Sequence, residues 1–298
     1  MRIAWTSDLH VDVCQRNADL LPHLSRRVAE LDADVLVIAG DVAEHVKDVQ
    51  QALQAFAGLR ATRLYIPGNH DLFTEEASDG SLLNSQQKLE KQLPEAAENS
   101  GFGYLGLRPY PVGTYTFVGT CGWFDASLQD TGLAPFLADH HYQSGVWRGL
   151  RSYDHGHVLW PATTVNYAMP CSGTAFWATD PALCDHMLRS LQQQLREASA
   201  ESSIIGVVHV LPFPEIVQRA SFGPSGFYDA WIGSARLGDC LRRDKRVRLV
   251  ISGHQHSITD CAITPQLRAV ANPVGDARKS PLDLPALAAE RVGVLDLP

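Results

Sequence analysis

The sequence predicts an α/β fold in which strands and helices alternate along a parallel sheet. Strands are expected at 2–6 (RIAWT) and 62–66, and the run at 34–39 (DVLVIA) has the continuous apolar character of a strand buried on both faces. Residues 17–31 carry apolar side chains at helical spacing, and 44–57 are expected to form a second helix. The order strand, helix, strand, helix, strand with short turns implies parallel strands joined by crossover helices.

The remainder of the chain contains the same kinds of element. In chain order we expect a helix at 81–98, a hairpin within 112–121, a helix from 179, a strand at 203–208, a helix from 234 to 243, a strand at 246–251, paired strands at 259–264 and 267–271, and a strand at 291–297. Thr179 and Ser234 are predicted helix caps, because their hydroxyl oxygens can accept from the first free backbone N–H groups.

Between about 125 and 178 the regular pattern breaks down, and Trp and His residues lie among Gly, Pro and Ser. Because loops this long are usually functional or flexible, we expect an insertion over the active face. Two interpretations stay open for its histidines: a solvated loop, which we favour, or part of a substrate pocket. These histidines are His140, His141, His155 and His157.

Composition favours a globular protein without a nucleic-acid or membrane surface. The chain has 298 residues, a net charge of -8 and a pI near 5.8, whereas binding to nucleic acid or anionic membranes needs a basic surface. Neither a signal peptide nor an apolar run of ~20 residues is expected. The six cysteines are scattered without a CxxC pair, so we expect reduced thiols and a cytoplasmic location.

Metal-capable side chains follow five of the expected strands. They are Asp8 and His10, Asp41, Asn69 with His70 and Asp71, His209, and His254 with His256. Functional groups gather at the carboxyl ends of strands in α/β sheets. Carboxylate, amide oxygen and imidazole suit Mn, Fe, Zn, Co or Ni. Taken alone, Asp41 is better explained as a helix cap and Asn69 as a turn former, but five such strand ends together favour one metal site.

The ordered blocks D-x-H, G-D, G-N-H-D, H and G-H-x-H resemble the calcineurin-like metallophosphoesterases, from Met1 to about Pro273. The resemblance implies a four-layer α/β/β/α sandwich of two mixed sheets flanked by helices. It also implies a single domain, 1–298, with the insertion at about 125–178. Two metal ions are implied as cofactors, with Asp41 bridging them. By resemblance one ion is held by Asp8, His10 and His256, and the other by Asn69, His209 and His254.

The resemblance also implies the chemistry. A metal-bridging hydroxide attacks the phosphorus of a phosphodiester or phosphomonoester, while Asn69 and His70 contact the substrate. His70 stabilises charge and protonates the leaving oxygen, and Asp71 orients it through the other ring nitrogen. A diesterase acting on a small or nucleotide-like substrate is favoured by analogy with capped family members. The alternative is a catalytically silent scaffold or protein-binding module, although such members typically lose the histidine that His70 represents.

Overall fold

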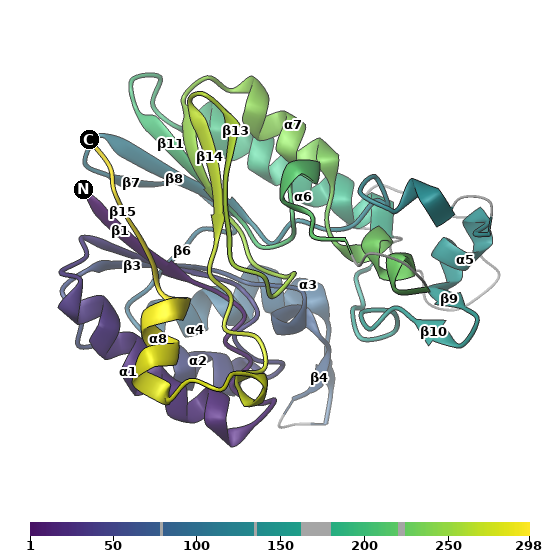
Figure 1. Cartoon of the computed structure of the whole chain (residues 1–298), viewed down its shortest axis with the longest axis horizontal. Coiled ribbons are helices and arrows are strands. Elements are labelled where there is room, and N and C mark those ends of the chain that lie inside the picture. The colour runs from purple at the N-terminus through teal and green to yellow at the C-terminus, as the bar shows by residue number, and fades with distance from the viewer. Residues whose placement is uncertain (78–79, 134–135, 162–179, 220–223) are drawn as a thin grey trace.

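Two β-sheets packed face to face form the body of the protein in the computed structural model, which describes residues 1–77, 80–133, 136–161, 180–219 and 224–298. One group of helices covers the outer face of the first sheet and another covers the second (Figure 1). The N- and C-termini lie close together, because the first and last strands pair. The predicted four-layer sandwich of two mixed sheets is confirmed.

The first sheet has the strand order β15-β1-β2-β3-β6. Its strands are β1 (Arg2–Thr6), β2 (Val35–Ala39), β3 (Thr62–Ile66), β6 (Gly103–Tyr104) and β15 (Gly293–Asp296). The pairs from β1 to β6 are parallel, and β15 runs antiparallel to β1. Its covering helices are α1 (Gln15–Glu30), α2 (Val46–Gln54), α4 (Leu93–Asn99) and α8 (Leu284–Arg291).

The second sheet has the order β13-β14-β12-β11-β8-β7. Its strands are β7 (Tyr110–Val112), β8 (Tyr115–Thr120), β11 (Ser203–Val208), β12 (Val247–Ile251), β13 (Thr259–Thr264) and β14 (Leu267–Ala271). The inner pairs are parallel and the two edge pairs antiparallel. Helices α6 (Asp180–Glu197) and α7 (Ala235–Arg243) cover its outer face, and Ser234 caps α7 as predicted. Thr179 lies outside the described residues.

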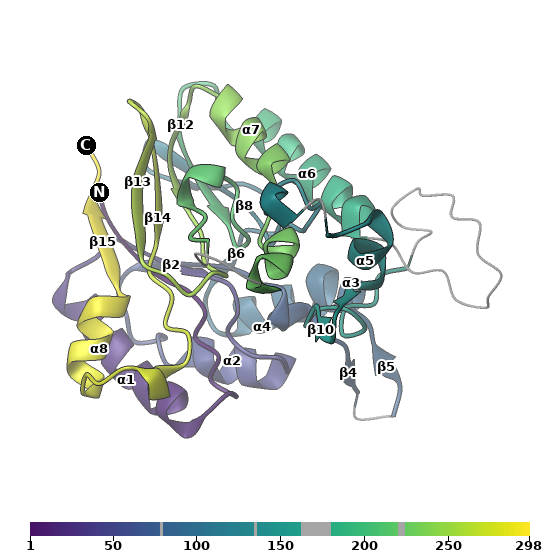
Figure 2. The same cartoon turned by 45° about the vertical axis from the view of Figure 1, so that its right-hand side comes forward.

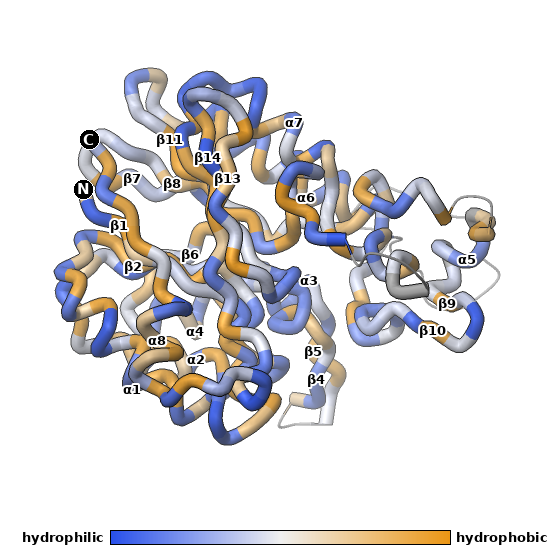
Figure 3. Tube along the Cα trace, viewed as in Figure 1, coloured by the Kyte–Doolittle hydropathy of each residue, from blue (hydrophilic) through white to orange (hydrophobic). Residues whose placement is uncertain are grey.

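Strand β2 shows why the interior strands lack polar alternation. Val35, Val37 and Ala39 pack in the core between the sheets, whereas Leu36 and Ile38 belong to the core beneath the helices. Successive side chains of a strand point to opposite faces of the sheet. A strand that has the second sheet packed on one face and helices on the other therefore needs apolar residues throughout. Figure 3 shows the corresponding hydrophobic stretches along β1 and near β11 and β14.

The expected helix at 81–98 is interrupted. Leu82–Leu83 forms strand β5, paired with β4 (Glu75–Glu76), and the helical part begins only after Asn84, whose side chain caps α3 (Ser85–Gln87). A π-helix, η2 (Lys88–Gln92), then leads into α4. Near the C-terminus, helix α8 was not predicted, and it delays the last strand to residue 293.

The described part of the insertion forms a lobe beyond the ends of the two sheets (Figure 1). It contains α5 (Asp139–Ser144) and a hairpin of β9 (Val146–Trp147) and β10 (Leu150–Arg151). Tyr142 and Trp147 pack on Phe227 of the 3₁₀ helix η6 (Pro224–Trp231), with ring centroids 6.3 and 5.9 Å away.

The last described segment of the insertion docks on the chain that follows β3, on the side that Figure 2 brings forward. Thr74 N–H donates to the carbonyl of His157 at 2.8 Å. Ser85 and Leu159 exchange two further hydrogen bonds, at 3.1 and 2.9 Å. These contacts fix residues 152–160 close to the strand end that carries Asn69 and His70.

Two expectations from composition concern the cysteines and the membrane. The described cysteines, Cys14, Cys121, Cys184, Cys240 and Cys261, are free thiols, and Cys171 lies outside the described residues. Within the described ranges, no helix has both the length and the apolar character needed to span a bilayer.

A buried lysine connects segments on either side of His70. The ammonium of Lys88 donates to the carbonyls of Glu44 and Phe73 at 2.6 and 2.7 Å, and it lies 3.7 Å from the Glu75 carboxylate. Burial lowers the pKa of Lys88, and the negative charge of Glu75 opposes this shift. The side chains of Glu44 and Phe73 both lie against the His70 ring. By binding their carbonyls, Lys88 therefore helps to hold the residues around that ring in place.

We expect Lys88→Met to lower the free energy of unfolding by about 3–5 kcal/mol, because it leaves a largely buried carboxylate and two carbonyls without their cation. Urea unfolding followed by circular dichroism measures the change. Lys91→Met, at an exposed position of the same π-helix, is the matched control and should shift stability by less than about 0.5 kcal/mol. Equal stability of the two variants would contradict the structural role of Lys88.

Candidate metal centre

Polar side chains from both sheets converge at one edge of the sandwich. Strands β1, β2 and β3 of the first sheet and β11 and β12 of the second all end there. The seven residues predicted as ligands lie together at this edge: Asp8, His10, Asp41, Asn69, His209, His254 and His256.

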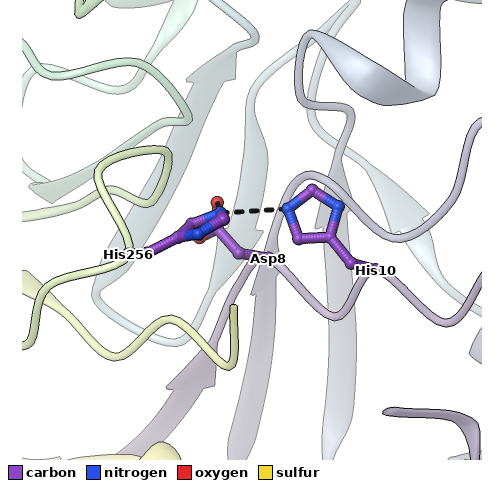
Figure 4. Close-up of side chains that lie close together, drawn as sticks. All are labelled: Asp8, His10 and His256. Atoms are coloured by element: carbon purple, nitrogen blue, oxygen red, sulfur yellow. Dashed lines mark hydrogen bonds and ion pairs between the residues drawn. The ribbon is translucent and has the colours of Figure 1, made fainter. Parts of the chain in front are cut away.

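One group consists of Asp8, His10 and His256, whose ligand atoms lie within 4.8 Å of one another. The Nε2 atoms of His10 and His256 are 3.0 Å apart and face each other, as Figure 4 shows. Nε2 of His256 also lies 3.4 Å from the Asp8 carboxylate. Two imidazole nitrogens and a carboxylate oxygen that point at one small volume form a suitable donor set for a transition-metal ion.

A second group consists of Asp41, His209 and His254, again within 4.8 Å. The side-chain oxygen of Asn69 joins it, 3.1 Å from Nε2 of His209 and 2.9 Å from Nδ1 of His254. This group therefore offers two imidazole nitrogens, a carboxylate and an amide oxygen, which also fits a transition-metal ion.

Asp41 connects the two groups. One carboxylate oxygen, Oδ2, lies 3.7 Å from Nε2 of His10 and 3.3 Å from Nε2 of His209. The other, Oδ1, accepts from the backbone N–H of His70 at 2.9 Å. A carboxylate held between two ligand groups is the feature that a two-metal centre needs for its bridging ligand.

The backbone adopts unusual conformations at this edge. Eight described non-glycine residues have positive φ, and five of them are predicted ligands: Asp8, His10, Asp41, His254 and His256. Gly40 has φ +88°, and a Cβ there would lie 2.5 Å from Nδ1 of His209. Such conformations cost free energy and persist only where the surrounding structure holds them, so they mark this edge as specialised.

Backbone carbonyls orient two of the histidines. Nδ1 of His209 donates to the carbonyl of Ala39 at 2.8 Å, and Nε2 of His254 donates to the carbonyl of Trp231 at 2.9 Å. These bonds leave Nε2 of His209 and Nδ1 of His254 facing the centre, which is the usual arrangement for a metal-ligating imidazole. Sequence patterns contain no signal for the Trp231 carbonyl, because it is a main-chain group at the end of the 3₁₀ helix η6.

Opposite charges within the centre stabilise each other. Burial raises the pKa of Asp41, but the positive charges of His209 and His70 outweigh burial and hold it well below its usual range. Burial lowers the pKa of His209, but Asp41 and Asp8 outweigh it and raise this pKa to about 10. These shifts favour the ionised form of Asp41, which is the form that binds a cation.

The two histidines of the GHQH block have pKa values shifted in opposite directions by their surroundings. Burial and the charge of His209 lower the pKa of His254 to about 4. Burial also lowers the pKa of His256, but the hydrogen bond and charge of Asp8 outweigh this and raise it. His254 thus belongs electrostatically to the second group and His256 to the first, as their contacts indicate.

His70 lies beside the ligand groups. Its ring is 22% exposed, with its centroid 4.9 Å from that of His10. Nδ1 lies 3.8 Å from the Glu44 carboxylate, and Tyr153 of the insertion stacks on the ring with centroids 5.2 Å apart. Sequence patterns contain no separate signal for Glu44, which lies in an expected helix, or for Tyr153, which lies in the aperiodic stretch.

The expectation that Asp71 orients His70 is wrong. The buried Asp71 carboxylate accepts from the backbone N–H groups of Val42, Ala43 and Gly68 and from the hydroxyl of Tyr65, at 2.8–3.0 Å. Burial raises its pKa to about 6. Because His70 and Asp71 are consecutive in a short 3₁₀ helix, their side chains point in different directions, and Asp71 binds the neighbouring loop instead.

The insertion supplies one further polar group. Asp154 is almost fully buried and accepts from the side-chain nitrogen of Asn69 at 2.6 Å, and burial raises its pKa to about 6. Of the insertion histidines, His157 stacks on Phe73 and Tyr153, so it packs near the centre and is not part of either ligand group. Asp154 lies in a stretch without periodicity, and sequence reasoning missed it.

Comparisons with known proteins agree with this geometry. Residues 1–257 match the family described as calcineurin-like phosphoesterase. None of the curated proteins searched matches the chain. Among solved structures, phosphopantetheinyl hydrolase from Mycobacterium tuberculosis is 17% identical with a TM-score of 0.69, covering 95% of this chain and 93% of that one. A dimetal phosphatase from Danio rerio is 14% identical with a TM-score of 0.50, covering 91% and 86%.

These likenesses in structure show the fold, and the family match covers most of the sequence. It includes every predicted ligand, from Asp8 to His256. Together with the two ligand groups, the match establishes what kind of protein this is. The chain belongs to the calcineurin-like phosphoesterase family, which carries out metal-dependent phosphoester hydrolysis.

Proposed function

We propose that the protein hydrolyses phosphoesters at two metal ions, with small phosphodiesters favoured over monoesters. The observation that carries this proposal is the position of Asp41 between two separate ligand groups. A single structural ion would need only one group, whereas a bridged pair serves an in-line displacement at phosphorus.

The ligand groups divide between the ions. Asp8, His10 and His256 would hold one, Asn69, His209 and His254 would hold the other, and Asp41 would contribute to both. When bound, such ions supply Lewis acidity, which activates water and neutralises charge on phosphate oxygens. The metals are of the Mn, Fe, Zn, Co or Ni type, because the donors are nitrogen and oxygen with no thiolate.

His70 protonates the leaving oxygen in this proposal. Its ring is partly exposed and adjoins His10, so it can reach a phosphoester placed over the first ligand group. Glu44, rather than Asp71, is the carboxylate that faces its Nδ1 atom. From this position the ring can act as a proton donor to a leaving oxygen and can stabilise charge on the phosphate.

Other features of the molecule favour a small substrate. The net charge of -8 disfavours long nucleic acids, and the insertion packs Tyr153 beside His70, which restricts the space over the centre. A solved structure that shares the fold is named a phosphopantetheinyl hydrolase, in keeping with a small phosphoester group. We further propose one catalytic domain with an insertion at about 125–178, located in the cytoplasm.

Metal-loaded protein should hydrolyse bis-p-nitrophenyl phosphate faster than p-nitrophenyl phosphate, because the diester is favoured. Chelation should abolish both activities, and Mn²⁺ or Zn²⁺ should restore them. Release of p-nitrophenol measures the rates. Metal-loaded protein that is inert to both compounds and to a wider phosphoester panel would instead support the scaffold alternative.

His70→Ala should keep its metal and lose about 10²–10⁴-fold in kcat, the usual contribution of a general acid. Metal analysis of the purified variant and single-substrate kinetics separate the two effects. His23→Ala, on the distant helix α1, is the histidine control and should match the wild type. A wild-type rate for His70→Ala would show that another group is the acid.

Asp41→Ala should lose most of its bound metal, because it removes the carboxylate that faces histidines of both ligand groups. Metal content after desalting is the readout. Asp32→Ala is the matched control, since Asp32 also has positive φ but is exposed, so the backbone cost is similar without loss of a ligand. If Asp41→Ala retains metal like Asp32→Ala, the bridging assignment fails.

A further inference from the structure

We infer that Asp154 of the insertion is a positioning residue that turns the amide of Asn69 so that its oxygen faces the metal centre. The Asn69 side-chain nitrogen donates to Asp154 at 2.6 Å, and this pair is buried. The inference rests on the proposed function, because it assigns Asn69 to a metal ion, but it concerns a residue outside all the strand-end blocks.

An asparagine ligand has an orientation problem that a carboxylate lacks. Its amide can present either oxygen or nitrogen, and only oxygen binds a cation. Here the oxygen faces Nε2 of His209 and Nδ1 of His254, at 3.1 and 2.9 Å. A carboxylate can accept from the amide nitrogen and would repel the amide oxygen. Asp154 on the far side of Asn69 therefore favours the orientation that binds metal.

Asp154 is held firmly enough to do this. Its own carbonyl accepts from the backbone N–H groups of His157 and Val158, which closes a tight turn. The same turn is bound to the main body through Thr74, whose N–H donates to the carbonyl of His157. The carboxylate thus enters the centre from a segment that is fixed on both sides, as a positioning group must be.

The contact makes the insertion part of the metal centre. Groups that orient a ligand typically change metal affinity by about 10–100-fold when they are removed. A merely structural buried pair would change the thermal stability of the protein but would affect both ions alike. Because Asn69 adjoins only the second ligand group, loss of Asp154 should weaken one binding event much more than the other.

The test is metal binding to full-length protein, measured by calorimetric titration of the metal-free form with Mn²⁺ or Zn²⁺. Asp154→Asn has nearly the same volume but can face Asn69 with either end of its amide. We expect this substitution to lower the affinity for one of the two metal ions by about 10-fold or more. Ser152→Ala, which removes a buried hydroxyl two residues away that has no hydrogen-bond partner among the described residues, should bind both ions like the wild type.

A swap of the pair provides the second arm. Asn69→Asp places two carboxylates against each other and should bind metal weakly. Combining it with Asp154→Asn restores an amide–carboxylate pair with the donor reversed, so the double variant should recover at least about 10-fold in affinity over Asn69→Asp. The swap remains informative even if Asp154→Asn alone does not fold, because it restores the pair.

Each outcome has one meaning. Wild-type affinity for both ions in Asp154→Asn, or a double variant that binds no better than Asn69→Asp, would overturn the role of Asp154. Wild-type protein that binds no metal would instead refute the proposed function. Metal-loaded wild type that lacks activity would refute the proposed hydrolysis, whereas the metal affinities of the variants would still decide the role of Asp154.

Discussion

The buried Asp41 carboxylate is the interaction on which the centre depends. One oxygen faces histidines from both ligand groups, and the other holds the backbone of His70. Asp41 can occupy this position only because Gly40 and Gly68 bring the ends of β2 and β3 together without side chains in the way. The two sheets then serve as a rigid frame that delivers groups from five strands to one carboxylate.

The buried charges and backbone conformations of this arrangement cost free energy when no metal is bound. Buried carboxylates lie beside buried histidines at one edge, and five of the seven predicted ligands have positive φ. Strain of this kind is retained at functional sites when the rest of the fold stabilises it. Here the apolar core between the sheets and the cores beneath the helices supply that stability. A bound cation would relieve the charge repulsion between Asp8 and Asp41.

The convergence of the seven predicted ligands could be expected from the sequence, because each follows an apolar strand and strand order determines where such ends lie. Side-chain direction was harder to infer. Asp71 adjoins His70 in the chain yet binds the loop of Val42 and Ala43, while Glu44, distant in sequence, faces His70. The broken helix before α4 was missed because Asn84 caps it locally, a short-range signal within an otherwise helical pattern.

Asp154 could not be predicted for a different reason. The segment around it is fixed by individual hydrogen bonds to Thr74 and Ser85 rather than by a repeating apolar face, so it leaves no periodic trace in the sequence. Its contact with Asn69 nevertheless joins the least regular part of the chain to the most regular part. The strands determine where the ligands lie, and the insertion determines how one of them is turned. Tyr153 lies beside His70, so the same segment also contacts the proposed acid. In the proposed function, metal binding and substrate access would therefore both depend on one turn of the insertion.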